Sequence, residues 1–599
     1  MDKIYEIVAA PRTGRTLVLL VVLFPFLAAL FVSLFGKRGR RVALLLALVH
    51  LGLAVSVAAI ASMHLGTRDE LSAGRGTDHA KFEPAMVPGA RAGDDGRTAW
   101  TLMSLTATPP SAGRAGPFVQ FFVGVDGLNL WLVALTSFMV VPAILVSWES
   151  VTERRGAFYA WLFVLQGAAV GAFLSFDVIL FYVFFELTLV PAFFLIGRWG
   201  PGSARRDAAR KFFLYTLAGS LLTLVGVVGV VVTNPDPTTG QITFSLPDLM
   251  ANVQHWLNAA QAEAAAGKPE KLAALHQTQL WLFIALMAGF MVKTPIFPFH
   301  TWLPSAYGEA PIGVTVLLSA VLAKLGTFGI LRFVLTLTPD AAVAYGLPVV
   351  GTLAAFGIVY AALCAYAQKD MKQMAAYSSV SHLGFVVLAV FAFNTEGVAG
   401  SVLHMVNHGL STGAVFALLA FLADRYRTTS MTQYGGLMGR FPNFAVLAFV
   451  LCLASVGLPG LNNFVSEMLM LGGLFRADAP KNHHYALAGI AAFSIFLSSW
   501  YIMTMLQRVF FSPHKEPPAD APGAAPPGDV NSRELIAFGS LAALCLVLGV
   551  YPQPVLDTIK ADVRIVTRIG DDARVRVYGE PKPTKVLVAA EPNNGKQDR

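Results

Sequence analysis

Four ionisable side chains stand inside apolar stretches of this sequence, where side chains of this kind are costly. Lys293 and Lys324 occupy two consecutive apolar runs, and Glu186 and Glu467 interrupt two others. A charged side chain at the centre of a bilayer costs about 2.5–3.5 kcal/mol on the most permissive scale, so four unpaired charges would cost on the order of 10–14 kcal/mol. That sum is comparable to the stability of a whole domain. These groups must therefore pair, share protons or contact water.

Two of the four charges lie beside predicted helix breaks. Lys293 is followed by the segment 294–298, which contains two prolines, and Glu467 follows the Gly-Leu-Pro-Gly segment 457–460. A proline removes a backbone donor and blocks the helical conformation of the residue before it. Interrupted helices at mid-membrane form the ion sites of many transporters. The pattern predicts a protonatable path through a membrane.

A purely structural role is the alternative for each charge. Glu186, five residues before Pro191, could form a buried ion pair with a lysine. Such pairs are often no more stable than apolar replacements, so packing alone explains them poorly. A neighbouring carboxylate favours the charged form of a lysine. Moving that carboxylate or its proton would therefore switch the lysine, which suits an element of a pump.

Histidines supply a second set of candidates. His404 and His408 lie four residues apart on one predicted helix face. Histidine titrates near neutral pH and can relay protons; the alternative is a pair of hydrogen-bonded core histidines. We expect no metal site, because the sequence has no H-E-x-x-H pattern and no third ligand close by. His382, and His300 beside the first break, are further candidates for the relay.

The composition sets the fold class that must position these residues. The chain has 599 residues, of which 55% are hydrophobic and 13% charged, whereas soluble domains carry about 25% charged residues. Repeated apolar runs of about 20 residues predict an all-α polytopic membrane protein with about fourteen transmembrane helices. The runs fall near residues 17–35, 42–63, 128–148, 158–176, 178–196, 212–232, 280–333 (two runs), 347–367, 375–393, 398–423, 444–474, 485–507 and 535–550.

The remaining composition excludes several other classes. The net charge of +8 needs no nucleic acid, because most basic residues lie in short loops beside apolar runs. Three widely spaced cysteines, Cys364, Cys452 and Cys545, predict neither a disulfide framework nor an iron–sulfur or zinc site. The sequence has neither a G-x-G-x-x-G nor a Walker A pattern. Any nucleotide or redox chemistry is therefore expected on another chain.

The predicted runs divide the chain into four parts. Residues 1–127 contain two helices and a long, largely disordered extracytoplasmic loop at 66–117, and residues 128–511 form the translocation core. Residues 512–559 contain a cytoplasmic loop and the last helix, and residues 560–599 a polar basic tail. The other long loop, 233–279, contains a possible surface helix at 246–266.

The order of the runs also predicts orientation and symmetry. Short loops with excess positive charge all fall on one side, which places that side in the cytoplasm and both termini outside. The two predicted breaks are five spans apart, and an odd offset implies inverted topology. We therefore expect two inverted five-helix repeats, near 158–332 and 347–507, each with one broken helix.

Five segments resemble one known family. They read KTPIFPFHTWLPSAYGEAP, LAKLGTFGILRF, FFELTLVPAFFLIGRWG, AYSSVSHLGF and HMVNHGLSTGAVF. They are similar to the antiporter-like subunits of proton-pumping NADH:quinone oxidoreductase, respiratory complex I, over about residues 121–550. The resemblance is strongest to the M type (mitochondrial chain 4), because Glu467 stands where the sister L and N types carry lysine. Mrp-type antiporters and membrane-bound hydrogenases contain similar subunits.

The resemblance implies a role for each candidate. Glu186 corresponds to the carboxylate that modulates the pumping lysine, Lys293, and Lys324 to the connecting lysine of the central axis. Axis positions are also occupied by His382, His404 and His408, with Glu467 as the terminal proton-transfer group.

The resemblance also implies a setting in the cell. The expected place is a bacterial inner (plasma) membrane, between L-type and N-type subunits. No cofactor is expected on this chain, and flavin mononucleotide, iron–sulfur clusters and quinone are expected on partner subunits. The alternatives are an Mrp-type cation/proton antiporter subunit, a membrane-bound hydrogenase subunit, or a non-pumping membrane scaffold.

Overall fold

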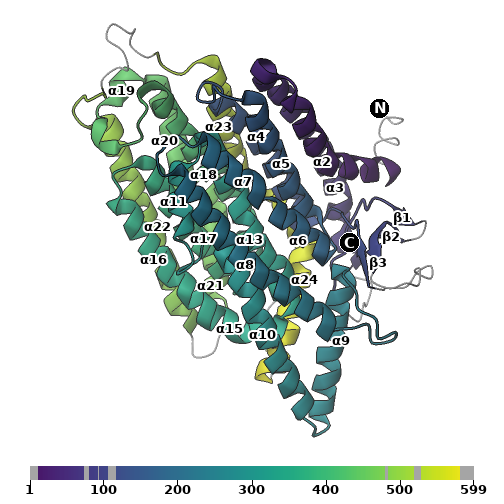
Figure 1. Ribbon diagram of the computed structural model, residues 1–599. Helices are drawn as coiled ribbons and strands as arrows, with labels where there is room; N and C mark the ends of the chain where they lie inside the picture. Colours follow the sequence, from purple (N-terminus) through teal and green to yellow (C-terminus); the bar gives the residue numbers. More distant parts are fainter. Residues whose placement is uncertain are drawn as a thin grey trace, which may run out of the picture.

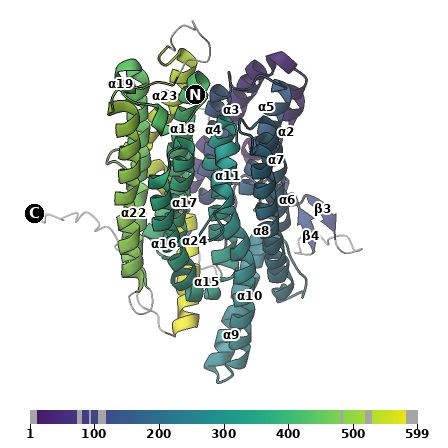
Figure 2. The same ribbon diagram turned by 60° about the vertical axis from the view of Figure 1, so that its left-hand side comes forward.

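The chain forms an elongated bundle of long, roughly parallel helices (Figures 1 and 2). The structure is a computed structural model and describes residues 11–72, 80–91, 94–104, 117–478, 483–517 and 528–579. In these ranges, 13 helices are long and apolar enough to cross a membrane. The interrupted pair α20 (Pro442–Val456) and α21 (Asn462–Phe475) supplies one further span. The prediction of about fourteen transmembrane helices is therefore confirmed.

The first seven spans precede the first break. They are α2 (Pro11–Ser33), α3 (Gly39–Ser72), α4 (Gly127–Val146), α5 (Arg155–Leu174), α6 (Val178–Leu187) continued by α7 (Leu189–Trp199), α8 (Arg205–Thr233) and α10 (Glu270–Lys293). The predicted surface helix is present as α9 (Leu246–Ala265), which lies at the bottom of Figure 1 and packs against α10. A short helix, α11 (Trp302–Glu309), follows the break.

The later spans contain several π-helical turns. The eighth span, residues 312–337, joins α12 (Ile312–Leu317), η2 (Leu318–Leu322), α13 (Ala323–Gly329), η3 (Ile330–Val334) and α14 (Leu335–Leu337). The others are α15 (Pro339–Tyr345) with η4 (Gly346–Gly351) and α16 (Thr352–Ala367), α17 (Met371–Val390), α18 (Thr395–Tyr426), α22 (His483–Leu506) with η7 (Gln507–Phe511), and α23 (Ser532–Val550). Short 3-10 and α turns are η1 (Gly36–Arg38), η5 (Met431–Gln433) and α19 (Leu437–Arg440).

Polar side chains fix where several of these helices begin. Asp126, Asp177 and Asp370 each accept backbone N–H bonds from the first turn of α4, α6 and α17, respectively. Such caps satisfy donors that have no partner inside the helix. Asp177 lies between two spans, and burial raises the pKa of its carboxyl to about 7. These caps set the register of the helices that carry the site.

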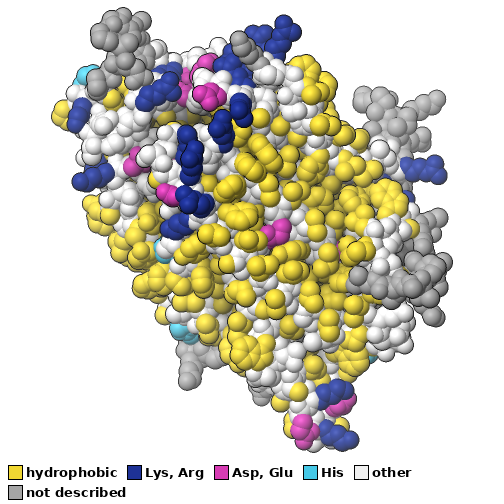
Figure 3. Space-filling view, in the orientation of Figure 1, with side chains coloured by type: hydrophobic (Ala, Val, Ile, Leu, Met, Phe, Trp, Pro, Cys, Tyr) yellow, Lys and Arg dark blue, Asp and Glu magenta, His cyan; other side chains and the backbone are white. Residues whose placement is uncertain are grey.

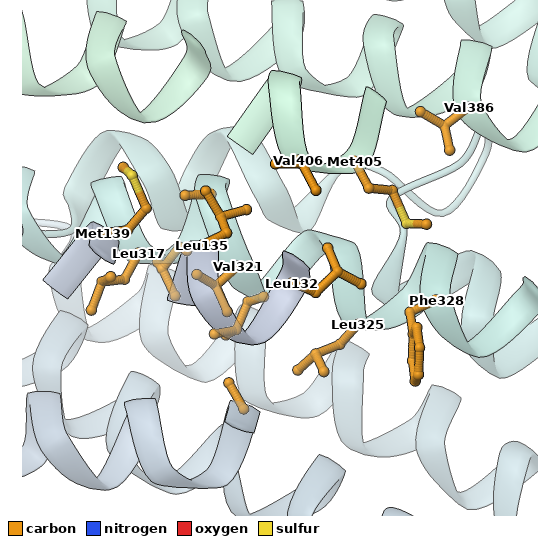
Figure 4. Close-up of a cluster of buried hydrophobic side chains, with 14 of the residues drawn as sticks. Leu132, Leu135, Met139, Leu317, Val321, Leu325, Phe328, Val386, Met405 and Val406 are labelled. Atoms are coloured by element: carbon orange, nitrogen blue, oxygen red, sulfur yellow. The ribbon is translucent and has the colours of Figure 1, made fainter. Parts of the chain in front are cut away.

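The centre of the bundle is formed by the eighth span and α18, whose apolar windows are entirely buried. Figure 4 shows a cluster of buried apolar side chains from α4 and from both of these elements, among them Leu135 of α4, Val321 of η2 and Met405 of α18. A Cβ on Gly409 would overlap Leu135, so this glycine allows α18 to approach α4 closely. Side chains on these central helices are thereby shielded from lipid.

The short basic loops gather at one end, as their charge pattern predicts. Arg40 and Arg533 both pair with Glu149, and Trp199 donates to the carbonyl of Glu153. Lys and Arg side chains crowd the upper end of the molecule in Figure 3, above a broad apolar surface. The basic loops therefore share one end, and which compartment that end faces remains a prediction.

The extramembrane loop at 66–117 is more ordered than predicted. Helix α3 extends to Ser72, and two antiparallel hairpins follow: β1 (Ala90–Arg91) with β2 (Asp94–Thr98), and β3 (Thr101–Ser104) with β4 (Phe118–Gln120). Gly89, in the left-handed region, leaves room for the Trp100 ring, which also contacts the ring of Phe121. The prediction of disorder is wrong for these parts; residues 73–79, 92–93 and 105–116 lie outside the described chain.

The predicted basic tail begins later than residue 560. A helix, α24 (Gln553–Tyr578), runs to residue 578 and packs against α3, α4, α15 and α18. Its apolar residues recur every three or four positions and are buried, including Val555, Ile559, Val563 and Val566. The many charges of this segment led to the prediction of a polar tail, although the spacing of its apolar residues is that of an amphipathic helix. Residues 580–599 lie outside the described chain.

Candidate functional site

The first predicted helix break is present at Lys293. Helix α10 ends at this lysine, and the chain becomes helical again only at Trp302, whose Nε1 donates to the carbonyl of Val292 at 2.9 Å. This bond satisfies a carbonyl that the break leaves without a helical donor. The lysine stands at the carboxyl end of its helix, where the helix dipole favours a cation. The carboxyl end of α10 is therefore a favourable position for the buried positive charge of Lys293.

Lys293 contacts the hinge between α6 and α7. Its Nζ donates to Thr188 Oγ1 at 3.1 Å and lies 4.4 Å from the centre of the Phe185 ring. Pro191, in the first turn of α7, has no N–H to bond back across this hinge. The lysine therefore rests on a locally weakened part of the neighbouring span.

Glu186 lies near Lys293 without forming a closed ion pair with it. The carboxylate is half-buried, its Oε1 has no hydrogen-bond partner among the described residues, and its charge is close enough to act on Lys293. Consecutive helix residues point about 100° apart, so Phe185 and Thr188 face the lysine while Glu186 is turned aside. The expected pairing is thus open in this structure.

Lys324 is fully buried beside a π-helical turn. Its Nζ donates to the carbonyl of Ser319, in η2, at 2.6 Å and lies 2.8 Å from His408 Nδ1. With the lysine as donor, His408 is neutral and accepts at Nδ1. Gly326, two residues on, packs directly against Lys293 and Thr294 at the first break. The two lysine helices therefore meet where α10 ends.

The three axis histidines form a compact group. The ring centres of His382 and His404 are 5.8 Å apart, and that of His408 lies 5.2 Å from His382 and 5.7 Å from His404. His382 Nδ1 is 3.6 Å from Glu467 Oε1. The structure thus brings together the predicted residues from Lys324 to Glu467. His300 lies apart from them, with its ring against Phe297 and Tyr360.

The second break uses glycine where the first uses proline. Gly457 and Gly460 adopt φ values of 78° and 90°, which favour glycine, and α21 begins two residues later. A Cβ on Gly457 would collide with Glu467 Oε2. This glycine therefore turns the chain and leaves room for the carboxylate.

Asparagines hold the second break together. Asn407 donates to the carbonyl of Asn462 at 2.6 Å, and Asn462 donates in return to that of Asn407 at 2.9 Å. Asn463 donates across the break to the carbonyl of Ser455 at 3.2 Å. Buried amides that bond to backbone in this way fix α18, α20 and α21 relative to one another.

A third candidate ligand lies closer than the sequence indicates. The sequence shows none near the two histidines of α18, yet folding places Glu467, from α21, beside His382 and His404, while the absence of a metal site stays a prediction. One candidate ligand atom of each residue lies within 4.8 Å of the other two. The groups come from three helices, so no local sequence pattern could show the cluster.

One more buried charge inside a span, that of Arg332, was not among the predicted site residues. Arg332, in the eighth span, is fully buried and forms a salt bridge with the equally buried Asp126. Its guanidinium also lies 4.5–5.2 Å from the rings of Phe82, Phe176 and Phe328. The position of Arg332 inside an apolar run could have shown this charge. Its partner Asp126 could not be recognised in the same way, because it precedes α4 and lies outside the apolar runs.

Comparison with known proteins identifies the family. The family model described as NADH:quinone oxidoreductase/Mrp antiporter transmembrane subunits matches residues 175–498. Subunit M of the NADH-quinone oxidoreductase of Mycobacterium tuberculosis is 36% identical over 493 residues, covering 77% of this chain and 84% of the relative. Chain 4 of the NADH-ubiquinone oxidoreductase of Arabidopsis thaliana is 34% identical over 454 residues, covering 76% and 83%.

Solved structures agree with this result. A chain of respiratory complex I from Thermus thermophilus has a TM-score of 0.71 and 28% identity, over 92% of this chain and 99% of that chain. A chain of the Mrp complex from Dietzia sp. has a TM-score of 0.70, over 94% of this chain and 99% of that chain, and its 17% identity indicates a shared fold alone. The resemblance seen in the sequence motifs is confirmed: the chain belongs to the NADH:quinone oxidoreductase/Mrp antiporter family of membrane subunits.

Proposed function

We propose that this chain is the M-type proton-translocating subunit of the membrane arm of an NADH:quinone oxidoreductase. The observation that carries the proposal is the buried sequence of protonatable groups from Lys324 through His408 and His382 to Glu467. Every side chain in this series is fully or almost fully buried. Buried polar groups in a membrane are costly, so an unbroken series of them is best explained by transport.

The proposed path begins at the first break. Lys293 changes its charge state when the Glu186 carboxylate moves or changes protonation, since the two are close but unpaired. Lys324 then exchanges its proton with His408, whose Nδ1 is 2.8 Å away. Histidine rings at centre distances of 5–6 Å pass the proton by ring rotation or through water. Glu467 is the terminal acceptor.

Partner subunits supply the driving reaction in this proposal. NADH oxidation by quinone takes place on other chains, which hold flavin mononucleotide, iron–sulfur clusters and quinone, with no redox centre on this one. The relatives named as subunit M and chain 4 support this assignment. We further propose L-type and N-type neighbours, a bacterial inner membrane, both termini outside, and inverted repeats around the two breaks.

A cation/proton antiporter subunit is the second candidate. The fold match to the Mrp complex from Dietzia sp. covers nearly the whole chain, so the fold does not separate the two functions. Identity favours the first, because the relatives that are 34–36% identical are named as oxidoreductase subunits. A non-pumping scaffold is the third, and the open Glu186–Lys293 arrangement argues against it, because a purely structural pair would be closed.

The test is isolation of the intact complex through an affinity tag on this chain. We expect flavin, iron–sulfur clusters and NADH:quinone activity to co-purify; their absence would favour the antiporter. In the same complex, Lys293→Met is expected to lower the protons pumped per electron while the assembled amount stays unchanged. Full pumping by this variant would support the scaffold.

A further inference from the structure

A compact set of ligand atoms lies at the far end of the histidine group. We propose that His382, His404 and Glu467 form a binding site for a Zn²⁺-like divalent cation. The three side chains come from α17, α18 and α21, and one nitrogen or oxygen of each lies within 4.8 Å of the other two. Binding is independent of the proposed function, since it requires only these three side chains.

The spacing is close to that of a metal site. Zinc binds histidine nitrogen and carboxylate oxygen at about 2.0–2.2 Å in tetrahedral geometry, which separates neighbouring ligand atoms by roughly 3.3–3.5 Å. His382 Nδ1 and Glu467 Oε1 are already 3.6 Å apart. The remaining distances are 4.8 Å or less. A bound ion would therefore draw the three side chains slightly closer together.

His404 is prepared to act as a ligand. Its Nδ1 is hydrogen-bonded to Ser466 Oγ at 2.9 Å, and its Nε2 is buried without a hydrogen-bond partner in the described chain. Asn407 also donates to Ser466 Oγ, at 3.2 Å, which holds the serine in place. Metal-bound histidines generally bond through their second nitrogen to such a partner, which fixes the ring and its tautomer. The unpartnered Nε2 is the atom left for a cation.

The donor set selects the kind of ion. Two imidazoles and one carboxylate suit Zn²⁺ and neighbouring transition metals, whereas Mg²⁺ and Ca²⁺ prefer oxygen ligands. Three protein ligands leave the fourth position of a tetrahedral zinc for water. His382 and Glu467 keep only 6% and 2% of their side chains exposed, so both are buried ligands.

The site adjoins the second break. Gly457 lies directly against the Glu467 carboxylate, and the next residue, Leu458, is exposed on the surface of the chain. An ion bound here would occupy Glu467 and two histidines at once. It would thereby remove three proton acceptors, so we expect the cation to inhibit any transport through this chain.

The experiment measures Zn²⁺ binding to the intact, chelator-treated complex. We expect one tight site that is lost in His404→Gln and Glu467→Gln, with at least about a tenfold fall in affinity for each. Ser466→Ala, which removes only the partner of the ligand, should lower the affinity by about tenfold, and by less than either ligand substitution does. Equal affinity in wild type and all three variants would overturn the proposal.

A matched control and a direct readout complete the test. His50 is a buried histidine whose ring nitrogens contact Val21 O at 3.0 Å and Gln166 Nε2 at 2.8 Å, so His50→Gln should leave Zn²⁺ binding unchanged. Zinc added to the wild-type complex should appear as density between the three side chains in an electron-microscopy map. Density elsewhere only, or binding that falls equally in His50→Gln, would contradict the site even if proton pumping depends on Glu467.

Discussion

Lys324 and Arg332 lie eight positions apart on the same buried span, and their surroundings differ in kind. Arg332 is paired with the carboxylate of Asp126 and enclosed by three phenylalanine rings. Lys324 has no carboxylate partner in the described chain and contacts a backbone carbonyl and a histidine nitrogen. Both side chains are fully buried. The charge of Arg332 is thus neutralised by an adjacent carboxylate, whereas Lys324 can exchange its proton with a neighbouring histidine.

The difference separates structural charges from transport charges. Arginine is always protonated in proteins and cannot release a proton to a path, whereas lysine can. Asp126 also caps α4, so the Arg332 pair fixes the start of a central helix. A histidine beside Lys324 can accept the proton that the lysine gives up. The buried charges of this fold therefore serve two purposes, and their partners show which is which.

The largest expected effect is on the structural side of the comparison. Arg332→Met leaves Asp126 buried without its partner, and breaking such a pair costs about 3–5 kcal/mol. We expect the amount of assembled complex and its thermal stability to fall. Protons pumped per electron should stay unchanged in the complex that does assemble.

A double variant sharpens this prediction. Asp126→Asn removes the unpaired charge and keeps a side chain able to cap α4. Added to Arg332→Met, it should recover part of the lost stability in a double-mutant cycle. Additive losses from the two changes would mean that the two side chains are not energetically coupled.

Lys324→Met should reverse the pattern. The side chains are similar in size, so assembly should be kept, but the proton donor beside His408 is gone. Positioned acid–base groups accelerate proton transfer by about 10²–10⁴-fold, so transport through this chain should slow by at least on the order of 100-fold. Proton pumping by reconstituted complex checks this, with Arg332→Met as the comparison. If Lys324→Met lowered assembly but left the protons pumped per electron unchanged, Lys324 would be a structural charge like Arg332.

A smaller effect is expected at the second break. Gly457→Ala forces a left-handed conformation on alanine, which costs about 1–2 kcal/mol, and pushes the new methyl group onto Glu467. Gly460 has the same handedness but nothing within 4 Å of its would-be Cβ. Gly460→Ala therefore carries the strain alone, and pumping should fall more in Gly457→Ala. Equal pumping by both would mean that the Glu467 carboxylate tolerates displacement.

The sequence predicted elements better than it predicted contacts. Apolar runs fixed the number of spans, and Pro295 and Gly457 marked the two breaks, because local backbone chemistry decides both. The Arg332–Asp126 pair and the approach of Glu467 to His382 join residues more than 80 positions apart, which only packing determines. The amphipathic helix α24 was predictable from its apolar spacing, which its many charges obscured.

The most direct test of the account is proton pumping by Glu186→Gln in the intact complex. Glutamine keeps the shape of the side chain and removes the charge that acts on Lys293. We predict normal assembly and fewer protons pumped per electron transferred from NADH to quinone. An unchanged ratio of protons to electrons would contradict the claim that the charge of Glu186 controls Lys293 during pumping.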